Sequence, residues 1–376
     1  MRNGQTFFRV VDEVTAESGS GEIAAVFVQA PGDLRYAFTI YEAAVQRGAT
    51  ILLIVVNVRS VYEYLLDIQL PDLELHFVPY FLQPMPRLPW TLFRIWRQLA
   101  SRYASIFADR KVSEAWFFCL EWDAVTPYFL KRLSKRASIF LVDHYGVTEP
   151  REKRWPLKLA VKWLLLRMVT GVSFGFCRET REAGAERVWR TAVDAAALGA
   201  KATALTPSVA RFPLPTVIRP PAVILMDSND EASPDMSGYP ETVSALLADL
   251  KARNVSVLLK AHPRSGHSPF LNQFGLPALP EGCPLELFDI RNVSAVIGTN
   301  SLGLATVANL GHRAVSLLCL VGFYNEETRR FWREYLDRQS GRRVLFPQST
   351  GEALEMIDGG LQGLQCTDPP VPQPIC

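Results

Sequence analysis

The chain of 376 residues lacks several features that identify common classes of protein. Its net charge is only +2, from 40 basic and 38 acidic residues, which gives no reason to expect nucleic acid as a partner. Its six cysteines are scattered without a Cys-x-x-Cys pair, so we expect buried thiols in a reducing compartment rather than disulfides or a zinc site. No Gly-x-Gly-x-x-Gly fingerprint follows the first apolar strand, which argues against a dinucleotide site.

Long uncharged hydrophobic runs are also absent. The longest candidate extends from Trp155 to Phe176 and is interrupted by Lys158, Lys162 and Arg167. A membrane-spanning helix needs about 20 nearly uncharged residues, so this run does not qualify. Residues 1–5 are polar and lead into no apolar segment typical of a signal peptide. We therefore expect a cytoplasmic protein.

What is present is an alternation of apolar strands and helical patterns in the first half of the chain. This alternation predicts a parallel sheet covered by helices on both faces. The predicted strands are Ile23–Gln29, Ala49–Asn57, Leu73–Pro79, Glu114–Leu120 and Ala137–Val142, and the predicted helices are 35–47, 59–67, 91–109 and 123–135.

The alternation restarts after a stretch over 205–221 that carries five prolines, a composition suited to a linker. Strands are predicted at 222–226, 255–260, 293–297 and 313–319, and helices at 239–253 and 302–310. The fold class is thus α/β, with two Rossmann-like domains whose parallel sheets face one another across a cleft. We predict an N-terminal domain over 1–205 that includes a basic helical segment at 151–170, a linker over 206–221, a second domain over 222–350 and a tail over 351–376.

A histidine and two cations, His262, Lys260 and Arg264, lie where the predicted strand 255–260 ends. Ligands of open α/β sheets bind at the carboxyl ends of strands, and a histidine that titrates near neutral pH suits a phosphate contact. The alternative is that His262 caps neighbouring backbone, Pro263 ends the strand and the cations are solvated.

A second polar segment, Gly298 to Ser301, separates the predicted strand 293–297 from the predicted helix 302–310. Hydroxyls and backbone N–H groups at a helix N-terminus favour an anion, most often a phosphate, so Thr299, Asn300 and Ser301 are candidate ligands. The same residue types are ordinary helix caps, and the two uses are compatible. Gly298 and Gly303 would let a phosphate approach the backbone closely.

His262-Pro263, Ser301 and the segment Pro284-Leu285-Glu286-Leu287-Phe288 together resemble bacterial sialyltransferases and polysialyltransferases of the GT-B architecture. The resemblance covers roughly residues 24–325. In that family a His-Pro motif and a Ser/Thr pair serve the donor, and a glutamate holds the ribose of CMP. The pair matches in part, because Asn300 stands at its first position. The resemblance implies a GT-B-like fold, a CMP-activated donor, no metal and no cofactor, with Glu286 at the ribose. The alternative for Glu286 is a surface residue at a helix start.

The general base is the least regular match. The family places two acids directly before a glycine, whereas this chain has Asp143-His144-Tyr145-Gly146 after the strand 137–142. Asp143 is one residue early. The resemblance leaves Asp143 as the first choice, His144 as the second, and a catalytically impaired chain as the third. An aspartate that merely starts a turn is the structural alternative.

The resemblance implies an inverting, metal-independent glycosyltransferase. It would transfer sialic acid or a similar acidic sugar from a CMP-activated donor to a surface glycan or glycolipid acceptor, such as capsule or lipooligosaccharide. The alternatives are a related transferase that uses CMP-Kdo or CDP-glycerol, a non-catalytic glycan-binding or accessory protein on the same fold, and a UDP-sugar epimerase.

The segment 151–170 carries a separate hypothesis. Arg151, Arg154, Lys158 and Lys162 recur at intervals of three and four residues beside tryptophans, which predicts a basic amphipathic helix. Such a helix can lie peripherally on the anionic inner membrane. It can equally be a core-packed helix with a solvated basic face, or a surface that holds an anionic acceptor.

Overall fold

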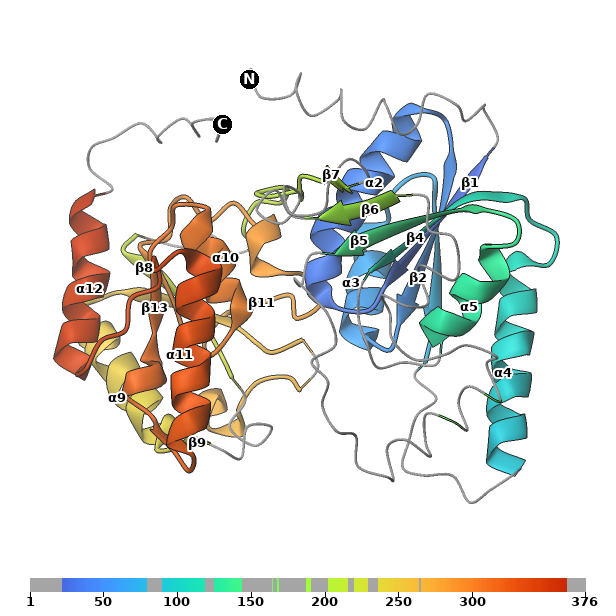
Figure 1. Cartoon of the computed structure of the whole chain (residues 1–376). Coiled ribbons are helices and arrows are strands. Elements are labelled where there is room, and N and C mark those ends of the chain that lie inside the picture. The colour runs from blue at the N-terminus through green and yellow to red at the C-terminus, as the bar shows by residue number, and fades with distance from the viewer. Residues whose placement is uncertain are drawn as a thin grey trace. The chain divides into compact units, whose positions relative to one another are not determined.

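The chain forms two compact units, Met1–Ser208 and Val209–Cys376, in a computed structural model (Figure 1). The structure describes residues 22–79, 90–118, 125–143, 164, 168, 187–190, 202–215, 220–228, 236–263 and 265–363.

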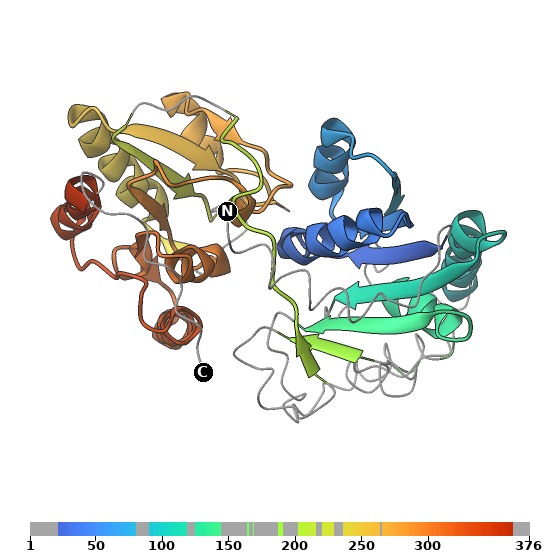
Figure 2. The same cartoon turned by 90° about the horizontal axis from the view of Figure 1, so that it is seen from above.

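The N-terminal unit contains a seven-stranded sheet in the order β3-β2-β1-β4-β5-β6-β7, in which neighbouring strands pair in parallel. Figure 2 shows β6 beside β5 at one end of this sheet. The strands are β1 (Ile23–Val28), β2 (Thr50–Val56), β3 (Leu73–Val78), β4 (Val112–Phe118), β5 (Ser138–Asp143), β6 (Arg187–Arg190) and β7 (Ala202–Ala204). The helices are η1 (Pro31–Asp33), α2 (Leu34–Gln46), α3 (Arg59–Ile68), α4 (Trp90–Phe107) and α5 (Val125–Leu133).

The central strands of this sheet are buried on both faces. Ala24–Val28 and Ile51–Val56 are each less than 5% exposed, as expected of apolar runs without alternation in a parallel sheet. On one face Phe27 stacks on Phe117 at 4.4 Å between ring centroids, and aromatic residues of α4 and α5 complete the cluster. The strand order reverses between β1 and β4, as in a doubly wound fold.

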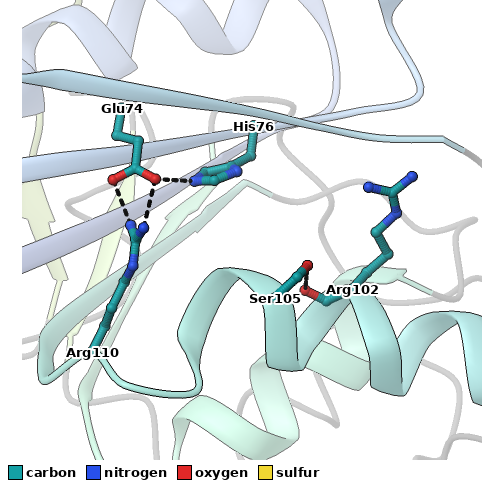
Figure 3. Close-up of polar contacts among 5 residues, drawn as sticks. All are labelled: Glu74, His76, Arg102, Ser105 and Arg110. Carbon is teal, nitrogen blue, oxygen red and sulfur yellow. Dashed lines mark hydrogen bonds and ion pairs between the residues drawn. The ribbon is translucent and has the colours of Figure 1, made fainter.

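The C-terminal end of α4 is tied to the edge strand β3. The Arg110 guanidinium donates to both carboxylate oxygens of Glu74, at 2.6 and 2.7 Å, and His76 Nε2 lies 2.8 Å from Glu74 Oε1 (Figure 3). These hydrogen bonds, that of Arg110 first, hold the pKa of Glu74 below its ordinary value. The bidentate contact therefore fixes the chain just after α4 against the sheet.

The C-terminal unit contains a five-stranded parallel sheet in the order β11-β10-β8-β12-β13. Its strands are β8 (Ala222–Met226), β10 (Ser256–Lys260), β11 (Ala278–Leu279), β12 (Ala295–Gly298) and β13 (Ala314–Ser316), and β9 (Met236–Ser237) pairs separately with β14 (Gly322–Phe323). The helices are α9 (Tyr239–Ala252), η3 (Pro269–Phe274), η4 (Leu285–Leu287), η5 (Leu317–Cys319), α10 (Leu302–Asn309), α11 (Glu326–Ser340) and α12 (Thr350–Gly363).

The predicted fold class, α/β with two Rossmann-like parallel sheets, is confirmed for the two units taken separately. The facing of the sheets across a cleft stays a prediction.

One predicted boundary needs correction. The tail over 351–376 is wrong for its first part, because α12 spans Thr350–Gly363 and buries Leu354 and Ile357 in the core. The boundary between the two units, after Ser208, falls within the predicted linker over 206–221. The backbone N–H of Ser208 donates to the N-terminal unit at Arg35 O (2.8 Å), and that of Ala210 donates to Glu286 O (2.9 Å) of the C-terminal unit.

Candidate functional site

The predicted phosphate-binding segments meet at one edge of the C-terminal sheet. In the strand register Lys260 pairs with Met226, and Ile297 pairs with Leu225, so β10, β8 and β12 end in the same row. Neighbouring strands are about 4.8 Å apart. The order reverses between β8 and β12, and such a point is where open α/β sheets bind ligands.

His262 lies on a tight turn directly after β10. Its backbone N–H donates to Gly266 O at 3.0 Å, and the Gly266 N–H donates back to His262 O at 2.8 Å. Gly266 has φ of +73°, which a residue without a side chain adopts readily. The imidazole is exposed, and its Nδ1 accepts from the Ser265 N–H at 3.2 Å, with Ser265 Oγ at 2.7 Å. Neutral His262 therefore carries its proton on Nε2.

The segment after β12 caps α10 as the sequence allows. Ser301 is the N-cap, and its Oγ accepts from the Gly303 N–H at 3.2 Å. Thr299 is fully buried, and its Oγ1 has no hydrogen-bond partner within the described part of the chain. Asn300 Oδ1 accepts from Ser228 Oγ at 3.4 Å, which joins this segment to the end of β8.

The two glycines of this segment have a packing reason that the sequence did not reveal. A Cβ at Gly298 would lie 3.3 Å from both Cβ and O of Met226, and one at Gly303 would lie 2.6 Å from Met226 Cε. Glycine at both positions lets β12 and α10 pack closely against β8. A phosphate approach there stays a prediction.

Lys260 is buried and makes its hydrogen bonds to backbone carbonyls of the C-terminal unit. It is 5% exposed, and its Nζ donates to Glu281 O at 2.9 Å and to Ala261 O at 3.1 Å. Burial lowers the pKa of Lys260 to about 8, although Cys283, Glu286 and Glu281 favour its charged form. The ammonium group thus holds the segment that carries Glu286.

Glu286 itself is buried, at 8% exposure, in the short helix η4. The alternative of a solvated surface glutamate is therefore wrong. A contact between Glu286 and the ribose of a nucleotide stays a prediction.

The remaining predicted site residues are Asp143, His144, Arg264 and the segment 151–170. Asp143 is the last residue of β5, in register with Arg190 of β6. His144 and Arg264 lie outside the described residues, as does the segment 151–170 except for Leu164 and Met168.

Sequence reasoning missed a polar network at the end of β8. Asp227 is 5% exposed and accepts hydrogen bonds from the Ser268 N–H, from Ser268 Oγ at 2.9 Å and from Tyr239 OH at 2.7 Å. The Ser228 N–H donates to Tyr239 OH at 3.2 Å. The sequence feature that could have indicated this network is the pair Asp227-Ser228, which directly follows the central strand β8. The network fixes the loop that follows His262 to the switch point of the sheet.

Within the described ranges, no three His, Cys, Asp or Glu side chains gather as the ligands of a metal ion would. Over the same ranges, none of the helices combines the length and the apolar character that crossing a membrane requires.

No known protein family matches the sequence, and neither does any curated protein. Among solved structures, UDP-GlcNAc 2-epimerase from Methanocaldococcus jannaschii is 9% identical, with a TM-score of 0.49 over 89% of this chain and 92% of its own. Arabidopsis thaliana UGT89C1 complexed with UDP is 13% identical, with a TM-score of 0.44 over 93% and 92%. Acinetobacter baumannii MurG is 10% identical, with a TM-score of 0.44 over 92% of each chain. Because the sequence identities and the TM-scores are this low, the similarity to these structures gives no information about the chemistry of this chain.

Proposed function

We propose that this chain is a glycosyltransferase with a nucleotide-activated donor, and that the donor is CMP-sialic acid or a similar CMP-linked acidic sugar. One observation carries the proposal. The His262 turn, with its proton on Nε2, and the N-terminus of α10, with the buried Thr299 hydroxyl beside it, follow strands on either side of β8 at the same sheet edge.

The proposed chemistry is an inverting displacement. The acceptor hydroxyl attacks the anomeric carbon, and the bond from that carbon to the phosphate oxygen breaks with its electron pair on the CMP phosphate. His262 Nε2–H and the N–H groups at the start of α10 would donate to this phosphate, which stabilises charge as it develops. Ser301 would contribute its hydroxyl proton, and Thr299 would gain an acceptor for its buried hydroxyl.

The acceptor proton needs a separate base. Asp143 at the end of β5 is the first candidate and His144 the second. Glu286 would bind the ribose hydroxyls, supported by Lys260, which hydrogen-bonds the same segment. A glycan or glycolipid is the proposed acceptor.

The first test is calorimetric titration with CMP, CDP, UMP and UDP. We expect selective binding of CMP that weakens at least about tenfold in His262→Ala, the loss of one charge-assisted contact. His267→Ala is the matched control, because His267 is also exposed on this loop and contacts Asn272 instead, at 2.7 Å. Absence of binding by any cytidine nucleotide contradicts the proposal, and selective binding of UDP would favour a UDP-sugar enzyme.

A second test addresses turnover. Protein incubated with CMP-sialic acid should release CMP, and Asp143→Asn should slow release without weakening CMP binding. CMP-Kdo and CDP-glycerol serve as competing donors that distinguish related transferases. Binding of CMP without release from any of these donors would favour a non-catalytic accessory role.

A further inference from the structure

The N-terminal half of α4 presents two large aromatic side chains to solvent. Phe93 is 52% exposed and Trp96 is 41% exposed, and their ring centroids are 5.9 Å apart. On the opposite side of the helix Ile95 and Leu99 are buried in the core of the N-terminal unit. The contacts of α4 with the core are thus made by Ile95 and Leu99, and the two exposed rings do not contribute to them.

The charges around these rings have one sign. Helix α4 contains Arg94, Arg97 and Arg102 and no acidic residue. The acid-free stretch is longer than the helix, since residues 79–107 hold four arginines and neither Asp nor Glu, although the whole chain has 38 acids. Arg94 and Arg97 are exposed next to the aromatic pair.

The two ends of α4 differ. Its C-terminal end is held by the core residues Ile106 and Phe107 and by the Glu74–Arg110 contact, while Arg102 stands apart from that carboxylate (Figure 3). The N-terminal end of α4 extends beyond the sheet and α5 in Figure 1. The aromatic pair is thus on the projecting half of the helix.

We propose that the projecting half of α4 binds an anionic lipid membrane surface. Phe93 and Trp96 would enter the headgroup region, where aromatic side chains are favoured, and Arg94 and Arg97 would contact lipid phosphates. Arginines near an anionic leaflet are attracted to its surface, so both would add to the binding. This proposal concerns another part of the sequence than 151–170, and it does not depend on the proposed transferase activity.

Charge distinguishes α4 from α11, a helix of the described part of the chain that also has an exposed aromatic side chain. Phe331 on α11 is likewise 52% exposed, but α11 carries four acidic residues among its arginines. Acids next to an aromatic residue are repelled by anionic lipid. Phe331 therefore provides a matched control for exposure without the cationic setting.

The test is co-sedimentation of the full chain with vesicles of phosphatidylcholine alone or mixed with phosphatidylglycerol. We expect binding to the mixed vesicles only, weakened by salt, and reduced at least about tenfold in Phe93→Ser/Trp96→Ser and in Arg94→Gln/Arg97→Gln. Phe331→Ser should bind as the unmodified protein does. Circular dichroism of each variant establishes that the fold is retained.

Four results would overturn the proposal. They are no binding of the unmodified chain to anionic vesicles, equal binding to neutral vesicles, unchanged binding of both α4 variants, and loss of binding in Arg154→Gln/Lys158→Gln alone. A concentration-dependent dimer that Phe93→Ser/Trp96→Ser abolishes would assign the surface to a second copy of the chain instead.

Discussion

The backbone N–H of Ser265 donates a hydrogen bond to Nδ1 of His262 over 3.2 Å. A ring nitrogen that accepts from an N–H must carry a lone pair, so the neutral imidazole is the Nε2–H tautomer. The turn that creates this contact is closed by two backbone hydrogen bonds between His262 and Gly266. The local chain thus prepares His262 as a donor through Nε2, the form that a phosphate contact needs.

This tautomer can be observed directly. In protein labelled with nitrogen-15 at its five histidines, the neutral form of His262 should show a protonated Nε2 and an unprotonated Nδ1. His262→Ala assigns the signal by its disappearance. Ser265→Pro removes the N–H donor and should produce a mixture of the two tautomers. A dominant Nδ1–H form in the unmodified protein would contradict the assignment.

The Asp227 network predicts a large effect from a change of one atom. Asp227→Asn places an amide N–H₂ or a weaker acceptor against three donors, from Ser268 and Tyr239. Loss of a satisfied buried carboxylate should lower the free energy of unfolding by about 2 kcal/mol in urea denaturation. Asp249→Asn, at an exposed position of α9, should change it by less than about 0.5 kcal/mol. Similar effects of the two substitutions would show that the network contributes little.

Strands and helices followed from the sequence because their patterns are local. The apolar runs at 24–28 and 51–56 are buried on both faces, and they correctly indicated central parallel strands. The common edge of His262 and Ser301 also followed, since the carboxyl ends of parallel strands lie together. Helix α12 was not predicted. Leu354 and Ile357 have helical spacing, but the residues that follow are polar and rich in proline, a composition typical of a tail.

The position of Lys260 could not be predicted for a different reason. Which way the last residue of a strand points is decided by what covers each face of the sheet. Here the covering segment is Glu281–Glu286, more than twenty residues away, and nothing in the local sequence indicates that it packs there. The Asp227 contacts to Ser268 are of the same kind, since they join residues forty-one positions apart.

The buried Lys260 predicts a stability that rises with pH. In the unfolded chain a lysine keeps its proton up to about pH 10.4, whereas the folded protein releases it near the lowered pKa of about 8. Between these values the unfolded state binds more protons, so the free energy of unfolding increases with pH, by at most about 3 kcal/mol.

Urea denaturation of the unmodified protein and Lys260→Met at about pH 7 and about pH 9.5 isolates this effect. From the lower to the higher pH, the free energy of unfolding of the unmodified protein should rise relative to that of Lys260→Met, because the variant has no group to titrate at this position. Lys251→Met, at an exposed position of α9, should show no such shift. A difference that is the same at both pH values would mean that Lys260 is not buried as described.

The Glu74–Arg110 contact predicts a stability term that acid removes. Glu74→Gln loses the bidentate charge-assisted pair that ties the end of α4 to β3, at a cost of about 1 kcal/mol for a half-exposed site. Glu63→Gln is the control, because the Arg59–Glu63 pair is more exposed and should contribute less to the free energy of unfolding than the Glu74–Arg110 pair does. Since the pKa of Glu74 is lowered in the folded state, its contribution is present above the ordinary glutamate range and disappears as pH falls through the folded value.

Urea denaturation at neutral and acid pH measures this contribution. The free energies of unfolding of Glu74→Gln and of the unmodified protein should differ at neutral pH and become equal in acid. Equal costs of the two substitutions at neutral pH, or a difference that persists in acid, would exclude the contact as the anchor of α4.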